Sequence, residues 1–251
     1  MKPRNRKLSF VFNELGLNVS RKRIARELAV ELGITPKLER FYPGHGWGLK
    51  YLAFKEGARN PFAVIKASSS IIERRLRVAL STKYAVPSRR FALEAEVLSR
   101  LANIDLGPKV MLLREHFFVR EYLEGKALAE FQPQEIAGLL TKVLGSIERA
   151  YGSGIFHTDL NAGNVIIRPD GRIGFIDCEV PASNIGEPPG ERERVYCHER
   201  LLHSLPAAVR KDSLLTDAAT RYYEAAANPP LTVARAIALL SEDDIIIEAP
   251  Q

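Results

Sequence analysis

The pattern of apolar and polar residues changes along the chain from a helical period to a strand-like one and back. Apolar Ile24, Leu28 and Leu32 recur at near-helical spacing within residues 20–34, which predicts an amphipathic helix. Basic residues cover its other side, as in helices that touch membranes or nucleic acids, but such helices more often pack on their own domain. From residue 38 to about 66, short β-type runs separated by Gly, Asn and Pro predict an antiparallel meander.

The remaining pattern predicts a second region made mainly of helices. A helix is expected over 89–104, two strands over 109–125, and a helix with one apolar stripe over 134–154. Residues from about 185 onward are rich in Ala and Leu and are expected to be helical. This order predicts an α+β fold with a sheet-rich N-terminal lobe and a helical C-terminal lobe. We expect a basic helical extension over 1–37, the N-lobe over 38–122 and the C-lobe over 123–251.

Composition narrows the class of protein without selecting a function. The chain is 46% hydrophobic and 26% charged, which is ordinary for a globular protein, and no long uncharged apolar run predicts a membrane span. Its only cysteines, Cys178 and Cys197, form no CxxC motif and indicate reduced thiols in the cytoplasm. A net charge of +6 suits nucleic acid, an anionic membrane or a phosphorylated substrate equally well.

Polar residues gather around a short apolar hairpin in HTDLNAGNVIIRPDGRIGFID, residues 157–177. With Asp170-Gly171 as a two-residue turn, Pro169 would pair with Arg172 and Asn164 would lie directly opposite Asp177. Amide and carboxylate oxygens in that arrangement suit Mg²⁺, and Asp159 on the preceding loop could accept a proton from a substrate hydroxyl. The alternative is that Asn164 only caps a strand and Asp177 only closes a turn.

A buried ion pair is expected further upstream. The period of two in PFAVIK places Lys66 on an apolar strand face, where a lysine needs an anion unless it reaches out to water. Glu94 falls on the apolar stripe of the helix expected over 89–104, so it needs a cation, and Lys66 is a suitable one. Arg89 and Arg90 are alternative partners. Three nearby glycines could admit a phosphate or form an ordinary hairpin loop, namely Gly44, Gly46 and Gly48.

These features, in this order, resemble the protein-kinase-like fold. The resemblance covers about residues 38–180 and implies a two-lobed fold that uses ATP and Mg²⁺. It implies a catalytic set of Asp159, Lys66, Asn164 and Asp177, with Asp159 as the base and the last two residues as metal ligands. It also implies that nucleotide contacts come from Gly44, Gly46, Gly48, Val64, Lys66, Glu94, Glu121 and Leu123.

Departures from the pattern of regulated protein kinases favour a different acceptor. Thr158 replaces the arginine of the HRD motif, Asn161 replaces the lysine of DxKxxN, and Cys178 replaces the phenylalanine of DFG. HTDLNAGNVII followed by FID most resembles the lipopolysaccharide kinase family, which phosphorylates Kdo or heptose sugars. HERLLHSL at 198–205 also resembles the Arg/Leu-rich segment that follows the catalytic core in that family. This resemblance implies lipopolysaccharide biosynthesis, an anionic sugar-lipid acceptor, and a cytoplasmic protein that could contact the inner membrane surface; nucleic acid is not expected.

Other functions stay open at this point. A small atypical protein kinase or ATPase of the RIO or Bud32 type has equally compact lobes. A pseudokinase would only bind partners, but binding alone does not require all five of Lys66, Glu94, Asp159, Asn164 and Asp177. An enzyme like the aminoglycoside phosphotransferases is a further alternative, although that group usually has His where this chain has Asn161.

Overall fold

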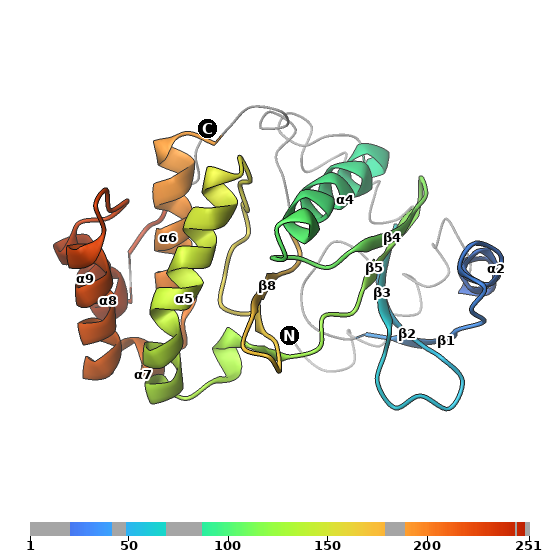
Figure 1. Cartoon of the computed structure of the whole chain (residues 1–251), viewed down its shortest axis with the longest axis horizontal. Helices are drawn as coiled ribbons and strands as arrows, with labels where there is room; N and C mark the ends of the chain where they lie inside the picture. Colours follow the sequence, from blue (N-terminus) through green and yellow to red (C-terminus); the bar gives the residue numbers. More distant parts are fainter. Residues whose placement is uncertain (1–20, 42–48, 69–86, 179–188, 244, 249–251) are drawn as a thin grey trace, which may run out of the picture. The chain divides into compact units, whose positions relative to one another are not determined.

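A computed structural model describes residues 21–41, 49–68, 87–178, 189–243 and 245–248 of the chain. The chain divides into two compact units (Figure 1). The N-terminal unit comprises Met1–Glu96 and Lys109–Tyr122, and the C-terminal unit comprises Val97–Pro108 and Leu123–Gln251.

The N-terminal unit contains a five-stranded antiparallel sheet. Its strands are β1 (Lys37–Arg40), β2 (Leu49–Phe54), β3 (Ala63–Ala67), β4 (Val110–Leu113) and β5 (Phe117–Glu121). They lie in the order β1-β2-β3-β5-β4. The central strand β3 is buried along its whole length, which explains why it reads as a nearly continuous apolar run.

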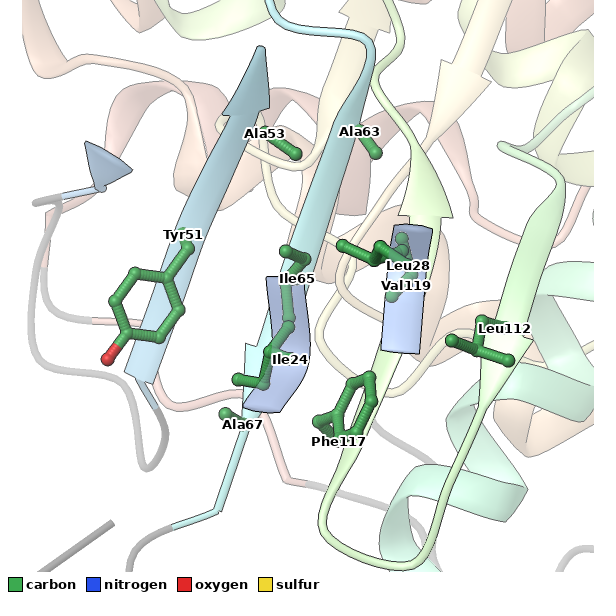
Figure 2. Close-up of a cluster of buried hydrophobic side chains, with 10 residues drawn as sticks. All are labelled: Ile24, Leu28, Tyr51, Ala53, Ala63, Ile65, Ala67, Leu112, Phe117 and Val119. Carbon is green, nitrogen blue, oxygen red and sulfur yellow. The ribbon is translucent and has the colours of Figure 1, made fainter. Parts of the chain in front are cut away.

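Helix α2 (Arg21–Leu32) packs on the sheet of this unit. Its two buried side chains, Ile24 and Leu28, join a core cluster with alternate residues of β3, such as Ile65 (Figure 2). The basic residues Arg21 and Arg26 are exposed. The helix thus takes the arrangement that is commoner for such amphipathic segments, with its apolar stripe on its own unit.

Helix α4 (Pro87–Asn103) runs from the N-terminal unit into the C-terminal unit, with the division after Glu96. Its buried stripe contains Glu94, Leu98 and Leu101, at the spacing that places residues on one side of a helix. The glutamate therefore lies on the buried side, among apolar residues, and needs a cation.

The C-terminal unit combines a small sheet with a group of helices (Figure 1). Strands β6 (Lys126–Ala127), β7 (Val165–Ile167) and β8 (Ile173–Phe175) form an antiparallel sheet, and the 3-10 turn η1 (Leu128–Glu130) follows β6. Helix α5 (Pro133–Gly152) buries a stripe that includes Ile136, Leu140 and Val143. It contacts α6 (Glu191–Ser204), α7 (Ala207–Arg210) and α8 (Ser213–Ala225), and α9 (Val233–Ser241) contacts α6 and α8.

The predicted α+β class is confirmed: the N-terminal region carries an antiparallel sheet and the C-terminal region is mainly helical. Gly44, Gly46 and Gly48 lie outside the described residues, and so do the side chains of Arg89 and Arg90. Residues 245–248 form no regular element. Among the described residues, no helix has the length and apolarity needed to cross a membrane.

Candidate active site

The loop between α5 and β7 holds Asp159 through a set of short-range hydrogen bonds. The side-chain nitrogen of Asn164 donates to the Asp159 carbonyl at 2.8 Å and to Asp159 Oδ2 at 3.2 Å. His157 Nε2 lies 3.0 Å from the carbonyl oxygen of Ile176, so the start of the loop is tied to the end of β8. The loop therefore brings Asp159 and Asn164 into direct contact, five residues apart in the sequence.

Asn161 closes the same loop from within. Its side-chain nitrogen donates to the Asp159 carbonyl at 3.0 Å, and its side-chain oxygen accepts the Gly163 N–H at 2.9 Å. An amide can make both bonds at once, whereas a lysine cannot accept one. The residue that stands where protein kinases have a lysine is thus occupied in shaping the loop.

The β7–β8 hairpin corrects one prediction. Val165 pairs with Phe175 and Ile167 with Ile173, so Asn164 lies opposite Ile176, whose N–H donates to the Asn164 carbonyl at 3.0 Å. The predicted pairing of Asn164 with Asp177 is wrong by one residue, and so is that of Pro169 with Arg172.

The turn explains this shift in register. Arg168 pairs with Arg172, and the N–H of Gly171 donates to the Arg168 carbonyl at 2.8 Å. Gly171 has a φ of +75°, as expected of the last residue of a three-residue loop. The Asp-Gly pair suits either a two-residue or a three-residue loop, and here Pro169 joins it in the longer one.

Asp177 follows the hairpin in an unusual backbone conformation. Its φ of +58° is in the left-handed region, where a residue with a Cβ is uncommon and aspartate is one of the better tolerated. One carboxylate oxygen, Oδ1, is buried. Such conformations persist where the surroundings hold them, and they cluster at functional sites. The left-handed residue turns the chain away from β8 immediately after the residue that faces Asn164.

The oxygen donors of this region fit a hard divalent cation. Both bonds from the Asn164 amide nitrogen go to Asp159, and within the described part of the chain its side-chain oxygen accepts none. Asp177 adds a carboxylate after the next strand. Groups of three or more His, Cys, Asp or Glu that could hold a metal do not occur among the described residues. Mg²⁺ commonly takes few protein oxygens and completes its shell with water and phosphate, so Asn164 and Asp177 suit it.

In the N-terminal unit, Lys66 on β3 and Glu94 on α4 form a direct ion pair. The two side chains are only 9% and 2% exposed, so each charge depends on its partner. The aromatic ring of Phe118 lies beside the pair, with its centroid 5.9 Å from Lys66 Nζ. Strand period and helix period together bring these residues into contact across 28 positions of sequence.

The other residues expected to contact a nucleotide lie in separate parts of the two units. Val64 is buried on β3, and the N–H of Glu121 at the end of β5 donates to the Lys109 carbonyl at 2.8 Å. Leu123, in the C-terminal unit, packs closely on Gly174: a Cβ at Gly174 would lie 2.6 Å from Leu123 Cδ1. These positions are compatible with packing roles, and their contact with a nucleotide stays a prediction.

Helix α6 contacts the loop at several positions that were not predicted from the sequence, two of them through Arg200 and Ser204. Arg200 Nη2 donates to Asp159 Oδ1 at 3.1 Å, and Ser204 Oγ accepts the Ala162 N–H at 2.8 Å. Both residues lie within the segment HERLLHSL. Local sequence offers no signal for a contact across about 40 residues, except that Arg200 and Ser204 share one side of a predicted helix.

The chain is similar to known kinases. A family model described as "RIO domain" matches residues 60–182. A Clostridium perfringens protein named "Probable serine/threonine-protein kinase" is 30% identical over 108 residues, which are 38% of this chain and 15% of that protein. The sperm motility kinase 2A of Mus musculus is 29% identical over 108 residues, or 40% of this chain and 20% of that protein. The chain thus aligns with a fifth or less of these relatives.

These matches and the fold support a place for the chain in the protein-kinase-like superfamily. The matched span of the RIO domain includes Lys66, Glu94, Asp159, Asn164 and Asp177. The RIO match favours the atypical kinase or ATPase alternative over the lipopolysaccharide kinase resemblance.

Proposed function

We propose that this chain is an ATP- and Mg²⁺-dependent phosphotransferase of the atypical kinase or ATPase type, as its similarity to the RIO domain suggests. The observation that carries the proposal is the loop in which Asn164 holds Asp159 while its own oxygen stays open to a cation. A carboxylate fixed in this way, beside an amide oxygen that suits Mg²⁺, meets the main needs of phosphoryl transfer to a hydroxyl or to water.

Each residue has a chemical role in the proposal. Asp159 accepts the proton of the attacking hydroxyl or water, which a positioned carboxylate can do within hydrogen-bond reach. Asn164 and Asp177 provide oxygens for Mg²⁺, which when bound neutralises charge on the phosphates. Lys66 binds phosphate oxygens as a point charge, and Glu94 fixes the direction of the lysine.

Within this proposal the acceptor is protein or water rather than a sugar-lipid. The RIO match supports that choice, and the Clostridium perfringens relative bears the name of a serine/threonine-protein kinase. The lipopolysaccharide acceptor and the membrane contact stay predictions from the motif HTDLNAGN. The choice of acceptor is tested by offering Kdo-lipid A and protein acceptors side by side with labelled ATP.

Activity is tested by measuring ADP release from Mg-ATP, with and without acceptors, for wild type and Asp159→Asn. General acid–base catalysis contributes about 10²- to 10⁴-fold, and the variant should lose an amount in that range. The matched control is Asp217→Asn on α8, an exposed carboxylate with no hydrogen bond or ion pair in the described part of the chain. Equal turnover of wild type and Asp159→Asn with every acceptor would refute the proposal.

A second pair of variants tests the phosphate role of Lys66. Lys66→Met should raise the KM for ATP and lower kcat, because the phosphates lose a cation. Lys55→Met removes an exposed lysine that follows β2 in the same unit and should leave both constants unchanged. An unchanged KM and kcat in folded Lys66→Met would exclude Lys66 from the nucleotide site.

A further inference from the structure

One side of α6 faces the loop that carries Asp159. The contacts come from positions 197, 200 and 204, which are three and seven residues apart and so share a helix side. They are Cys197 Sγ to the His157 carbonyl at 3.6 Å, Arg200 Nη2 to Asp159 Oδ1 at 3.1 Å, and Ser204 Oγ from the Ala162 N–H at 2.8 Å. Two of these contacts hold the loop backbone, whereas the Arg200 contact holds the reactive carboxylate itself.

Asp159 is held from two directions. Arg200 donates to Oδ1 at 3.1 Å and Asn164 donates to Oδ2 at 3.2 Å. One donor comes from α6 and the other from the end of the loop, so a rotation of the carboxylate would lengthen at least one bond. A carboxylate that accepts a proton must present a fixed lone pair to the hydroxyl, and a misplacement of about 1 Å can cost about 10²-fold in rate.

Arg200 also supplies a cation that the loop does not provide. Asn161 uses its side-chain nitrogen and oxygen within the loop, at 3.0 and 2.9 Å. Among the described residues, Arg200 is the basic side chain that pairs with Asp159. It is 35% exposed and Asp159 is 41% exposed, so both remain accessible to a substrate while they are paired.

The buried Nε atom of Arg200 points to a functional constraint on this side chain. Its Nε atom is buried and has no hydrogen-bond partner in the described part of the chain, which is an unfavourable arrangement for a donor. A lysine would avoid this cost but would lose the planar geometry that fixes the direction of the outer nitrogens. The arrangement therefore leaves Nε without a hydrogen bond but keeps the guanidinium directed at Asp159.

We propose that Arg200 is a positioning residue of the phosphotransfer reaction, which holds Asp159 in the orientation that accepts the hydroxyl proton and supplies the positive charge missing at Asn161. This inference rests on the proposed function. It predicts a loss in kcat rather than in ATP affinity, because Arg200 acts through Asp159 rather than through the nucleotide.

The test compares Mg-ATP turnover of wild type, Arg200→Ala, Arg200→Lys and the control Arg221→Ala. Arg221 lies on α8, and its exposed side chain makes no hydrogen bond or ion pair in the described part of the chain. Arg200→Ala should lower kcat by about 10- to 100-fold and change the KM for ATP less than about twofold. Arg200→Lys should fall between, because it keeps the charge without the fork. Guanidinium chloride at millimolar concentration should restore part of the kcat of Arg200→Ala and none of that of Asp159→Asn.

Three results would overturn the inference: wild-type kcat in Arg200→Ala, a change confined to KM, or no rescue of a folded Arg200→Ala by guanidinium. Folding is checked by far-UV circular dichroism, and Arg200→Lys keeps the test valid if the alanine variant fails to fold. Absence of Asp159-dependent turnover in wild type would instead overturn the proposed function, and the role of Arg200 with it. Turnover in wild type that Arg200 variants leave intact would overturn only the role of Arg200.

Discussion

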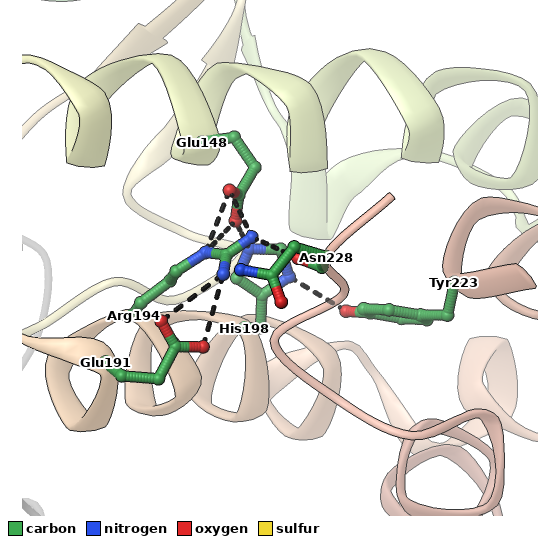
Figure 3. Close-up of polar contacts among 6 residues, drawn as sticks. All are labelled: Glu148, Glu191, Arg194, His198, Tyr223 and Asn228. Carbon is green, nitrogen blue, oxygen red and sulfur yellow. Dashed lines mark hydrogen bonds and ion pairs between the residues drawn. The ribbon is translucent and has the colours of Figure 1, made fainter. Parts of the chain in front are cut away.

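Glu148→Ala should strongly destabilise the C-terminal unit, because Glu148 is the common partner of two buried side chains (Figure 3). Its Oε2 lies 2.7 Å from Arg194 Nη2, and its Oε1 lies 2.7 Å from His198 Nε2. On the far side of the ring, His198 Nδ1 lies 2.9 Å from the Tyr223 hydroxyl. A neutral ring satisfies both contacts when Nε2 donates to the carboxylate and Nδ1 accepts from the tyrosine.

The magnitude follows from what the substitution leaves behind. The side chains of Arg194 and His198 are only 8% and 0% exposed, and loss of one member of a buried pair costs about 3–5 kcal/mol. Two features favour the lower end of that range. Glu148 itself is 28% exposed, and Arg194 keeps its bonds to Glu191 and to the Asn228 carbonyl. We expect a loss of about 3 kcal/mol for alanine and about 1–2 kcal/mol for Glu148→Gln, which keeps an acceptor for His198.

Urea denaturation followed by far-UV circular dichroism at pH 7.5 measures these losses, as shifts of the midpoint at an unchanged m-value. Glu224→Ala on α8 is the control, because the Glu224 side chain is exposed and makes no hydrogen bond or ion pair among the described residues. Its effect should stay within about 0.5 kcal/mol. A loss below about 1 kcal/mol in Glu148→Ala would show that the network does not hold the helices together.

Three further predictions concern pH, backbone geometry and thiol reactivity. Burial lowers the pKa of His198, so below pH 6.5 the unfolded chain binds a proton that the folded chain does not, and the free energy of unfolding should fall with pH by up to about 1.4 kcal/mol per pH unit. Urea denaturation at pH 7.5 and 5.5 should show a smaller fall in the free energy of unfolding for His198→Asn than for wild type. Gly125→Ala should cost more than about 2 kcal/mol in the same assay, because φ is +151° and a Cβ would lie 2.4 Å from the Ile167 carbonyl oxygen, whereas Gly138→Ala, with open space around it on a helix, should stabilise by about 0.5–1 kcal/mol. Burial raises the pKa of Cys197 to about 12, so that thiol should resist alkylation by iodoacetamide at pH 8 until the chain is unfolded.

Regular periods in the sequence were enough to predict the pair of Lys66 and Glu94. Each residue stands on the apolar side of its own element, where a charge needs a partner, and the period of two or of 3.6 identifies that side without any tertiary information. The sequence also indicated that Asp159 and Asn164 lie close together, because they are five positions apart in one short loop.

The parts that were not predicted depend on turn geometry and on distant contacts. Asp170-Gly171 suits a two-residue and a three-residue hairpin loop, and a change of one residue in loop length shifts every partner in the hairpin. Arg200 and Glu148 could not be identified as partners of Asp159 and His198, since those contacts span 41 and 50 residues and depend on how the helices pack.

Helix α6 connects the buried network with the loop of Asp159. Its residues 194 and 198 contact Glu148, while residues 197, 200 and 204 contact the loop. At about 100° per residue, these two sets lie roughly a quarter to a third of a turn apart on the helix. The network thus fixes the rotation and height of α6, and with them the point from which Arg200 reaches Asp159. A variant that weakens the network without unfolding the chain, such as Glu148→Gln, should then lower kcat, because α6 and Arg200 are held less firmly. A change of equal stability cost that leaves α6 in place should not, and this difference separates positioning by the helix from stability alone.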